Sequence, residues 1–544
     1  MALYHSLHNP DHLDSLDLEI LNKRDAFGLP PRSVCNALVE CFFNWIAPVF
    51  PVVDRYAFMK RYNDPQNPPS ILLLQAMIMV AARFHTQCED RDGYTVSPRA
   101  FYKKAKALYD AGYERDPVTI VQAVVLLGAY WEGPDDLTES GIFYWSRLGI
   151  ALAQELGLYD RESYAALDPS GQGLRKRIWW TLFTRDRSVA AAFGRPLHIN
   201  LDDCTVEPLE YCDFIECDGL PSQDATDKTR AQFFIEYVRL CQLMDLGLCL
   251  RLSSRSTQDT RSAGAAQCEL GLSTWLMSCP RELQWKQSHH SFLPAVLSST
   301  FYTIVCQLHL VQAPYCSKES QSSAFHAASM IISILETLQS HGELRYSPPF
   351  TICHAVVSFV TLKLQMEASL PSLLHGIWLK LECNLELLEA LSRTWPIAKL
   401  FLEFFQPMAT PDKFNRLLAA AVEKCHERAH GTESNSAASA KRSAPFKRPK
   451  VQQVILPQSR IVLQILARET QKRRTALSHS QNTQYTAQDT EAVPFGIIPE
   501  SSADSDESAS AFADPMEDCD PSIILQNLQQ IIQIGRLQDA ESTV

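Results

Sequence analysis

Residues 141–203 constrain the fold of this chain more than any other stretch. They form two amphipathic helical patterns joined by a polar loop, and they end in a Gly-Arg-Pro corner. In the second pattern the apolar residues recur at the α-helical period and fall on one broad arc: Leu174, Ile178, Trp179, Leu182, Phe183, Val189 and Ala190. Arg185 and Asp186 project into that arc, and a buried charge must be paired or must line a cleft. We therefore expect an internal ion pair or a cleft on this helix. The other polar side chains are expected on its solvated side: Lys176, Arg177, Thr184, Arg187 and Ser188.

The rest of the chain favours an all-α body. Apolar residues repeat at three and four positions, few stretches alternate with period two, and only 20 of the 544 residues are glycine. Dipeptides such as Asp116-Pro117 and the capping residue Asp54 mark expected helix starts. A polar linker is expected over 253–267. The longest apolar runs, 71–82 and 120–129, are shorter than the ~20 residues that cross a bilayer, so no membrane span is expected.

Charge and cysteine content narrow the class of protein. The net charge of −12 argues against nucleic acid coating the whole chain, because phosphate binding needs a basic surface. The 16 cysteines follow no apolar signal segment. Several of them lie within apolar helical patterns: Cys41, Cys241, Cys249, Cys306 and Cys353. We expect reduced, buried thiols in an intracellular protein.

The composition changes after residue 430, which predicts three parts: a lead-in over 1–30, a helical body over 31–430 and a disordered tail over 431–544. Residues 441–474 carry ten Lys and Arg against one acid. The candidate nuclear import residues in this block are Lys441, Arg442, Lys447, Arg448 and Lys450. The alternative is a solvated linker.

An acidic segment follows the basic block. Residues 489–520 carry ten Asp and Glu and no Lys or Arg, with apolar residues interspersed: Phe495, Ile497, Ile498, Phe512 and Met516. This composition is typical of an activation region that folds on a coactivator, and the alternative is an acidic tail that serves solubility only. Residues 521–537 form a short amphipathic pattern.

Two metal motifs give the competing hypothesis, a helical metalloenzyme. His426, Glu427 and His430 match H-E-x-x-H, in which a helix presents two imidazoles to zinc beside a general base. The match falls in the last turn of a helix, where histidines favour the helix dipole in any case. Asp135, Asp136 and Glu139 match a magnesium-binding DDxxE pattern, but Asp136 and Glu139 fit a capping box better. We expect no catalytic residue, no resident metal and no cofactor in these residues.

Residues 141–203 also resemble the middle homology region of fungal zinc-cluster transcription factors, the fungal-specific transcription factor domain. One helix ends in the family's L-A-x-x-L-G-L pattern, at Leu152, Ala153, Leu156, Gly157 and Leu158. The second part of the family pattern is matched by Arg177, Trp179, Trp180, Phe183, Asp186, Arg187, Gly194, Arg195 and Pro196, with Ala190 where serine is usual. The stretches 29–62 and 71–84 resemble the cutinase transcription factor branch. The resemblance covers about residues 12–205 well and extends to about 430 loosely.

The resemblance implies a helical regulatory domain of a nuclear transcription regulator, with control of a secondary-metabolite gene cluster or of lipid- and cutin-related genes. Family members also carry a six-cysteine cluster, C-x2-C-x6-C repeated, that holds two zinc ions and reads DNA. The 544 residues contain no such pattern. We therefore expect either upstream coding sequence that supplies the cluster, or a co-regulator that reaches DNA through a partner. A homodimer is compatible with both.

The family motif sharpens the expectation for Asp186. Its carboxylate should be buried and paired with an arginine, and Arg195 and Arg147 are the leading candidates. Arg175 shares the helix but lies roughly 16 Å along it, which is too far.

Overall fold

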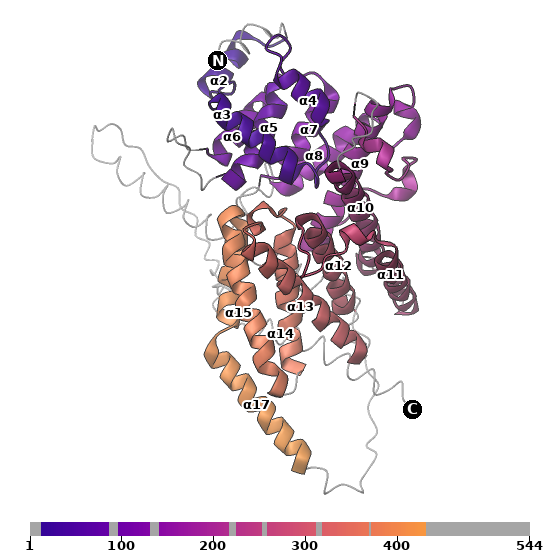
Figure 1. The fold of residues 1–544 in the computed structure, drawn as a ribbon, viewed down its shortest axis with the longest axis vertical. Helices are drawn as coiled ribbons and strands as arrows, with labels where there is room; N and C mark the ends of the chain where they lie inside the picture. Colours follow the sequence, from indigo (N-terminus) through magenta and orange to yellow (C-terminus); the bar gives the residue numbers. More distant parts are fainter. Residues whose placement is uncertain are drawn as a thin grey trace, which may run out of the picture. The chain divides into compact units, whose positions relative to one another are not determined.

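The computed structural model describes residues 12–85, 96–130, 141–216, 225–252, 258–311, 318–368 and 371–430. All of them belong to one structural unit, within Met1–Gln312 and Cys316–Val462. In these ranges the regular elements are helices, and the one β-type pairing is an isolated bridge between Lys286 and His289 (Figure 1). The all-α prediction is confirmed. No helix in the described ranges has the length and apolar character needed to span a bilayer.

The N-terminal helices pack around α5. In chain order they are α2 (Ser15–Lys23), α3 (Arg32–Cys41) with the π-helical turn η1 (Phe42–Ile46), α4 (Arg55–Tyr62), α5 (Ile71–His85), α6 (Pro98–Asp110), α7 (Pro117–Leu127) and α8 (Ile142–Glu155). The side chain of Asp54 accepts a hydrogen bond from the backbone N–H of Ala57, and that of Asp116 accepts one from Thr119, so both predicted helix starts are confirmed. α5 is buried almost all round because α3, α6 and α7 contact it.

Two long helices follow α9 (Pro169–Phe193): α10 (Ala225–Leu252) and α11 (Gln258–Ser278). The predicted polar linker over 253–267 is wrong from Gln258 onward, where α11 begins. Small and polar residues dominate this helix, and its apolar stripe is narrow. Ala265, Cys268, Leu272 and Trp275 form that stripe at helical spacing, and all four are buried.

The later helices form a bundle in which α12 to α15 lie side by side (Figure 1). Their bounds are α12 (Phe292–Val311), α13 (Lys318–Ser340), α14 (Thr351–Ala368) and α15 (Pro371–Thr394), followed by α16 (Ile397–Phe405) and α17 (Pro411–His430). Of the cysteines expected inside helical cores, Cys241, Cys306 and Cys353 are buried and Cys41 is half-buried. The domain limits at residues 30 and 430 stay predictions, and the basic and acidic tail lies outside the described residues.

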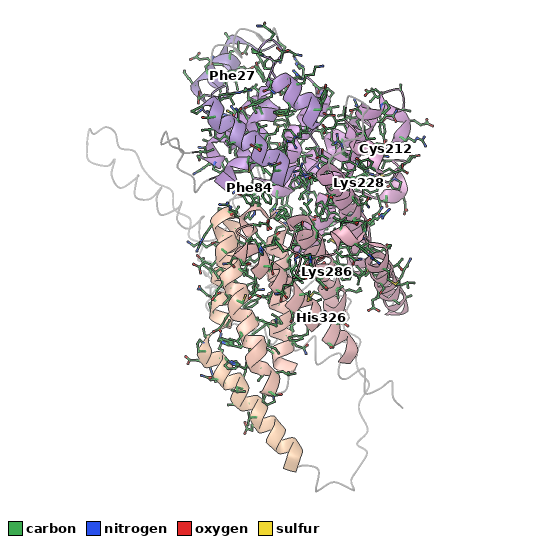
Figure 2. The ribbon with its side chains drawn as sticks, in the orientation of Figure 1. Phe27, Phe84, Cys212, Lys228, Lys286 and His326 are labelled. Atoms are coloured by element: carbon green, nitrogen blue, oxygen red, sulfur yellow. The ribbon has the colours of Figure 1, made fainter. Side chains whose placement is uncertain are left out.

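Aromatic rings connect α5 to this bundle. Phe84 lies at the C-terminal end of α5, near the end of the bundle at which α13 and α15 finish (Figure 2). Its ring centroid is 5.7 Å from that of Tyr346 and 6.3 Å from that of Trp395. Trp45 stacks on Tyr346 at 4.1 Å, and the indole N–H of Trp395 donates to the carbonyl of Ser347. These contacts fix the N-terminal helices against the turn that precedes α14.

Candidate functional site

The central helix of the candidate site is α9, which carries most of the family motif. It begins after Asp168, whose carboxylate accepts from the N–H of Gly171, and it continues for 25 residues. It ends at Gly194, whose φ of 63° is left-handed and suits glycine. From Lys176 onward the helix is buried on every side, because α8, α10 and the turn η5 (Tyr211–Phe214) all pack on it.

The predicted solvated side of α9 is therefore wrong. Its five members, Lys176, Arg177, Thr184, Arg187 and Ser188, are all buried. The η5 segment covers the first two, and Ser188 lies beside Tyr237 of α10. These side chains are polar although they are buried, because they pair with other polar groups of the protein. The sequence pattern of one helix does not distinguish such paired residues from solvated ones.

Asp186 is buried, as predicted, and is paired with an arginine, but that arginine is its neighbour Arg187. The guanidinium Nη1 of Arg187 donates to Asp186 Oδ2 at 2.8 Å. The backbone N–H groups of His198 and Ile199 also donate to this oxygen, each at 3.0 Å, and Nδ1 of His198 lies 3.2 Å from Oδ1. The proposed partners are wrong: Arg147 is exposed on α8, and the guanidinium of Arg195 lies over the ring of Phe143.

Arg187 extends this network to α10. Its Nη2 donates to the carbonyl of Ile199 at 2.7 Å and to the carboxylate of Asp245 at 3.0 Å. The guanidinium carbon lies 4.0 Å from the ring centroid of Phe183 one turn earlier. The side chain is 1% exposed. Asp186 and Arg187 thus hold the end of α9, the corner after Gly194 and α10 in one arrangement.

A second polar cluster joins the start of α9 to residues 210–216. Lys176 Nζ donates to Asp213 Oδ2 at 2.6 Å, and the same oxygen accepts from the N–H of Glu210. Arg177 lies 4.0 Å from the carboxylate of Glu216. That carboxylate also accepts the first two N–H groups of α4, those of Arg55 and Tyr56. Burial, and the nearby charge of Asp54, raise the pKa of Glu216.

A mostly apolar cavity of about 80 Å³ also borders α9. Arg185, Ser188 and Val189 of α9 line it together with Tyr237 of α10 and Phe401 of α16. The Nη1 group of Arg185 donates to the carbonyl of Val125 at 2.5 Å. The two expectations for Arg185 and Asp186 are thus both met, because Asp186 forms an ion pair and Arg185 lines a cavity.

The remaining motif residues support the core. The rings of Trp179 and Phe183 are fully enclosed, and the indole N–H of Trp180 donates to the carbonyl of Glu207 at 3.0 Å. Sequence reasoning missed His198, Ile199, Asp245 and Gly128, which complete the surroundings of the three charges 185–187. The helical pattern of α9 does not mark them, because His198 and Ile199 follow the corner after Gly194, while Gly128 and Asp245 reach α9 from the end of α7 and from α10.

The metal hypotheses gain no support from the described residues. Within the described ranges, no group of three His, Cys, Asp or Glu side chains is placed to hold a metal ion. Asp135, Asp136 and Glu139 lie outside the described residues, as do the import candidates Lys441, Arg442, Lys447, Arg448 and Lys450. His426, Glu427 and His430 belong to the last turns of α17, where the structure describes the backbone only.

Comparison with known proteins gives the class of this chain. The fungal specific transcription factor domain matches residues 39–342, more than half of the chain, and the chain belongs to this family. The matched region contains the whole of α9 and both of its polar clusters.

Individual relatives agree with this assignment. The chain is 40% identical to Cutinase transcription factor 1 alpha of Fusarium vanettenii over 433 residues, which are 77% of this chain and 47% of the relative. It is 27% identical to the Acetamidase regulatory protein of Aspergillus fumigatus over 402 residues, which are 72% of this chain and 50% of the relative. The chain spans about half the length of these curated relatives. No solved structure matches it.

Proposed function

We propose that this chain forms the regulatory part of a nuclear transcription regulator of the fungal zinc-cluster type, and that it is not an enzyme. The observation that carries the proposal is the family match over residues 39–342. The chemistry of α9 supports it, because Asp186 and Lys176 each form a buried ion pair with a group of the chain itself. Charges paired in this way stabilise a scaffold and are not free to act on a substrate.

The proposed control is pathway-specific. One relative is named Cutinase transcription factor 1 alpha, and another, 29% identical over 187 residues, is the Fusaric acid cluster transcription factor FUB12 of Gibberella fujikuroi. Cutin- or lipid-related genes, or a secondary-metabolite cluster, are the corresponding targets for this chain. Contact with DNA would come from the family's six-cysteine zinc cluster or from a partner protein. No resident cofactor is proposed for these 544 residues.

The acidic segment is proposed to recruit a coactivator, and a fusion tests this. Joining residues 489–544 to an unrelated DNA-binding domain should raise transcription of a reporter about tenfold or more, because a short acidic segment with apolar residues folds onto its partner. The matched control replaces Phe495, Ile497, Ile498, Phe512 and Met516 with alanine and keeps every acid. Reporter output equal to that of the DNA-binding domain alone would remove the activation role, and full output from the control would show that these five apolar residues do not carry it.

The basic block is proposed to direct nuclear import. Replacing Lys447, Arg448 and Lys450 with alanine removes three of the ten positive charges in residues 441–474 and should move a fluorescently tagged chain into the cytoplasm. The control exchanges the same residues for the other cation, Lys447→Arg, Arg448→Lys and Lys450→Arg, and should keep the chain in the nucleus. A nuclear alanine variant would contradict the import role.

A further inference from the structure

Arg185 differs from the other buried cations of α9. Lys176, Arg177 and Arg187 each lie within 4.0 Å of a carboxylate oxygen. Arg185 is also buried, but in the part of the chain that the structure describes no carboxylate lies within that distance of it. Its neighbours are the carbonyl of Val125 and the ring of Phe50, whose centroid is 5.0 Å from the guanidinium carbon.

The charge of Arg185 persists in this environment. Burial lowers the pKa of its guanidinium to about 10, which leaves it protonated at neutral pH. Among the described residues, an ionised Tyr237 would favour this charge, but burial raises the pKa of its phenol and keeps it neutral. A buried charge without a counter-ion destabilises a fold, so an anion beside Arg185 would be strongly favoured.

The surroundings of Arg185 leave space for such an anion. Arg185 lines the cavity of about 80 Å³ together with Ser188 and Tyr237, whose hydroxyl oxygens are 3.4 Å apart. Gly128, at the end of α7, makes this position of the guanidinium available. A Cβ atom on Gly128 would stand 2.4 Å from Nη1 of Arg185. The arginine therefore occupies a place that only glycine opposite it allows.

The remaining residues that line the cavity indicate the chemical character of the rest of the ligand. Val189 of α9, Ile352 and Val356 of α14 and Phe401 of α16 present hydrocarbon to the cavity. A cavity of roughly 150 Å³ with such walls holds the six carbon atoms of benzene, so this cavity, about half that size, suits a ligand of three or four heavy atoms such as acetate. The cavity thus combines one fixed positive charge, two hydroxyl groups and a short apolar space.

We propose that this cavity is a binding site for a short aliphatic monocarboxylate, with its carboxylate on Arg185 and its hydrocarbon tail against α14 and α16. Arginine suits this role because its planar guanidinium matches a carboxylate with two parallel hydrogen bonds. The ligand supplies a counter-ion that the residues described in the structure do not provide. Binding of this kind does not depend on the proposed role in transcription.

Calorimetric titration of the purified full-length chain tests the proposal. Acetate should bind at least about tenfold more tightly than acetamide, its neutral isostere, because only the carboxylate balances the buried cation. Methylamine, which carries the opposite charge on the same methyl group, should not bind. Equal affinity for acetate and acetamide, or no binding of acetate, would overturn the proposal. These outcomes involve neither DNA nor a reporter, so they are independent of the tests of transcriptional function.

Two variants locate the binding. Arg185→Met should lower acetate affinity at least about tenfold and leave acetamide affinity unchanged. Ala192→Leu keeps Arg185 but fills space at the cavity wall, and should abolish binding of both ligands. Wild-type affinity for acetate in either folded variant would place the carboxylate elsewhere. The comparison of acetate with acetamide on the unaltered chain decides the charge requirement even if Arg185→Met does not fold.

Discussion

Replacing Asp186 with alanine should lower the free energy of unfolding by about 3–5 kcal/mol, one of the two largest effects expected in this chain. The change removes the nearest counter-ion of Arg187, whose side chain is 1% exposed. It also leaves the N–H groups of His198 and Ile199 without the carboxylate that accepts from both. Urea unfolding of the purified chain, followed by tryptophan fluorescence, measures the loss, because Trp179 and Trp180 lie within two turns of the altered residue.

Asp245→Ala is the matched control for this prediction. Asp245 also accepts from Arg187, at 3.0 Å, but its side chain is 19% exposed and Arg187 keeps Asp186 in this variant. The loss should be less than half that of Asp186→Ala, because a partly solvated ion pair contributes less than a buried one. Equal losses in the two variants would show that Asp186 is not the main partner of Arg187.

The second large effect concerns the buried pair of Lys176 and Asp213. Lys176→Met leaves a carboxylate buried without its cation, and Asp213→Asn leaves the ammonium group buried without its anion. Each single change should lower the free energy of unfolding by about 3–5 kcal/mol. The double variant should recover to within about 1 kcal/mol of the unaltered chain, because methionine and asparagine bury no charge. The amide oxygen that Asp213→Asn introduces can still accept from the N–H of Glu210, as the carboxylate does.

An exposed pair provides the comparison for this cycle. On α2, Lys23 Nζ lies 2.5 Å from Glu19 Oε1, and the two side chains are 74% and 57% exposed. The same double-mutant cycle there should give a coupling energy below about 0.5 kcal/mol, since water and salt screen it. If the Lys176–Asp213 cycle gives a coupling as small as this, burial of the pair does not control its strength.

Much of the fold could be predicted because its helix starts are encoded locally. Asp116 followed by Pro117 supplies both a capping carboxylate and a fixed φ, and α7 begins at Pro117. Asp54 caps α4 in the same way. The start of α11 could not be predicted from such signals, because residues 253–267 are polar and small and the buried stripe of α11 begins only at Ala265. The starts of α4 and α7 thus followed from local sequence signals, whereas the start of α11 did not.

The surroundings of α9 show which contacts a sequence pattern cannot predict. Periodicity places Arg187 away from Asp186 because adjacent residues are about 100° apart on a helix. The long arginine side chain nevertheless turns back to the carboxylate, and α10 encloses both. Asp245, 58 residues after Arg187, supplies the second carboxylate. Such a partner depends on how α10 packs on α9, and the pattern of α9 alone carries no information about that.

The sequence predicted the cavity beside Arg185 only in part. A charged residue within an apolar arc indicated that Arg185 would be paired or would line a cleft. Which of these applies depends on Gly128, Tyr237 and Phe401, and they come from three different helices or helix ends. The presence of an unusual charge was therefore visible in the sequence, while the composition of its surroundings was not.

The position of the cavity walls has a practical consequence for producing parts of this protein. The family match ends at residue 342, but Ile352, Val356 and Phe401 beyond it complete the cavity. A recombinant fragment cut at the family boundary would lose these walls and uncover the faces of α12 and α13 that α14 buries. Such a fragment would be prone to aggregate. The smallest fragment that retains the cavity extends through α16, to Phe405.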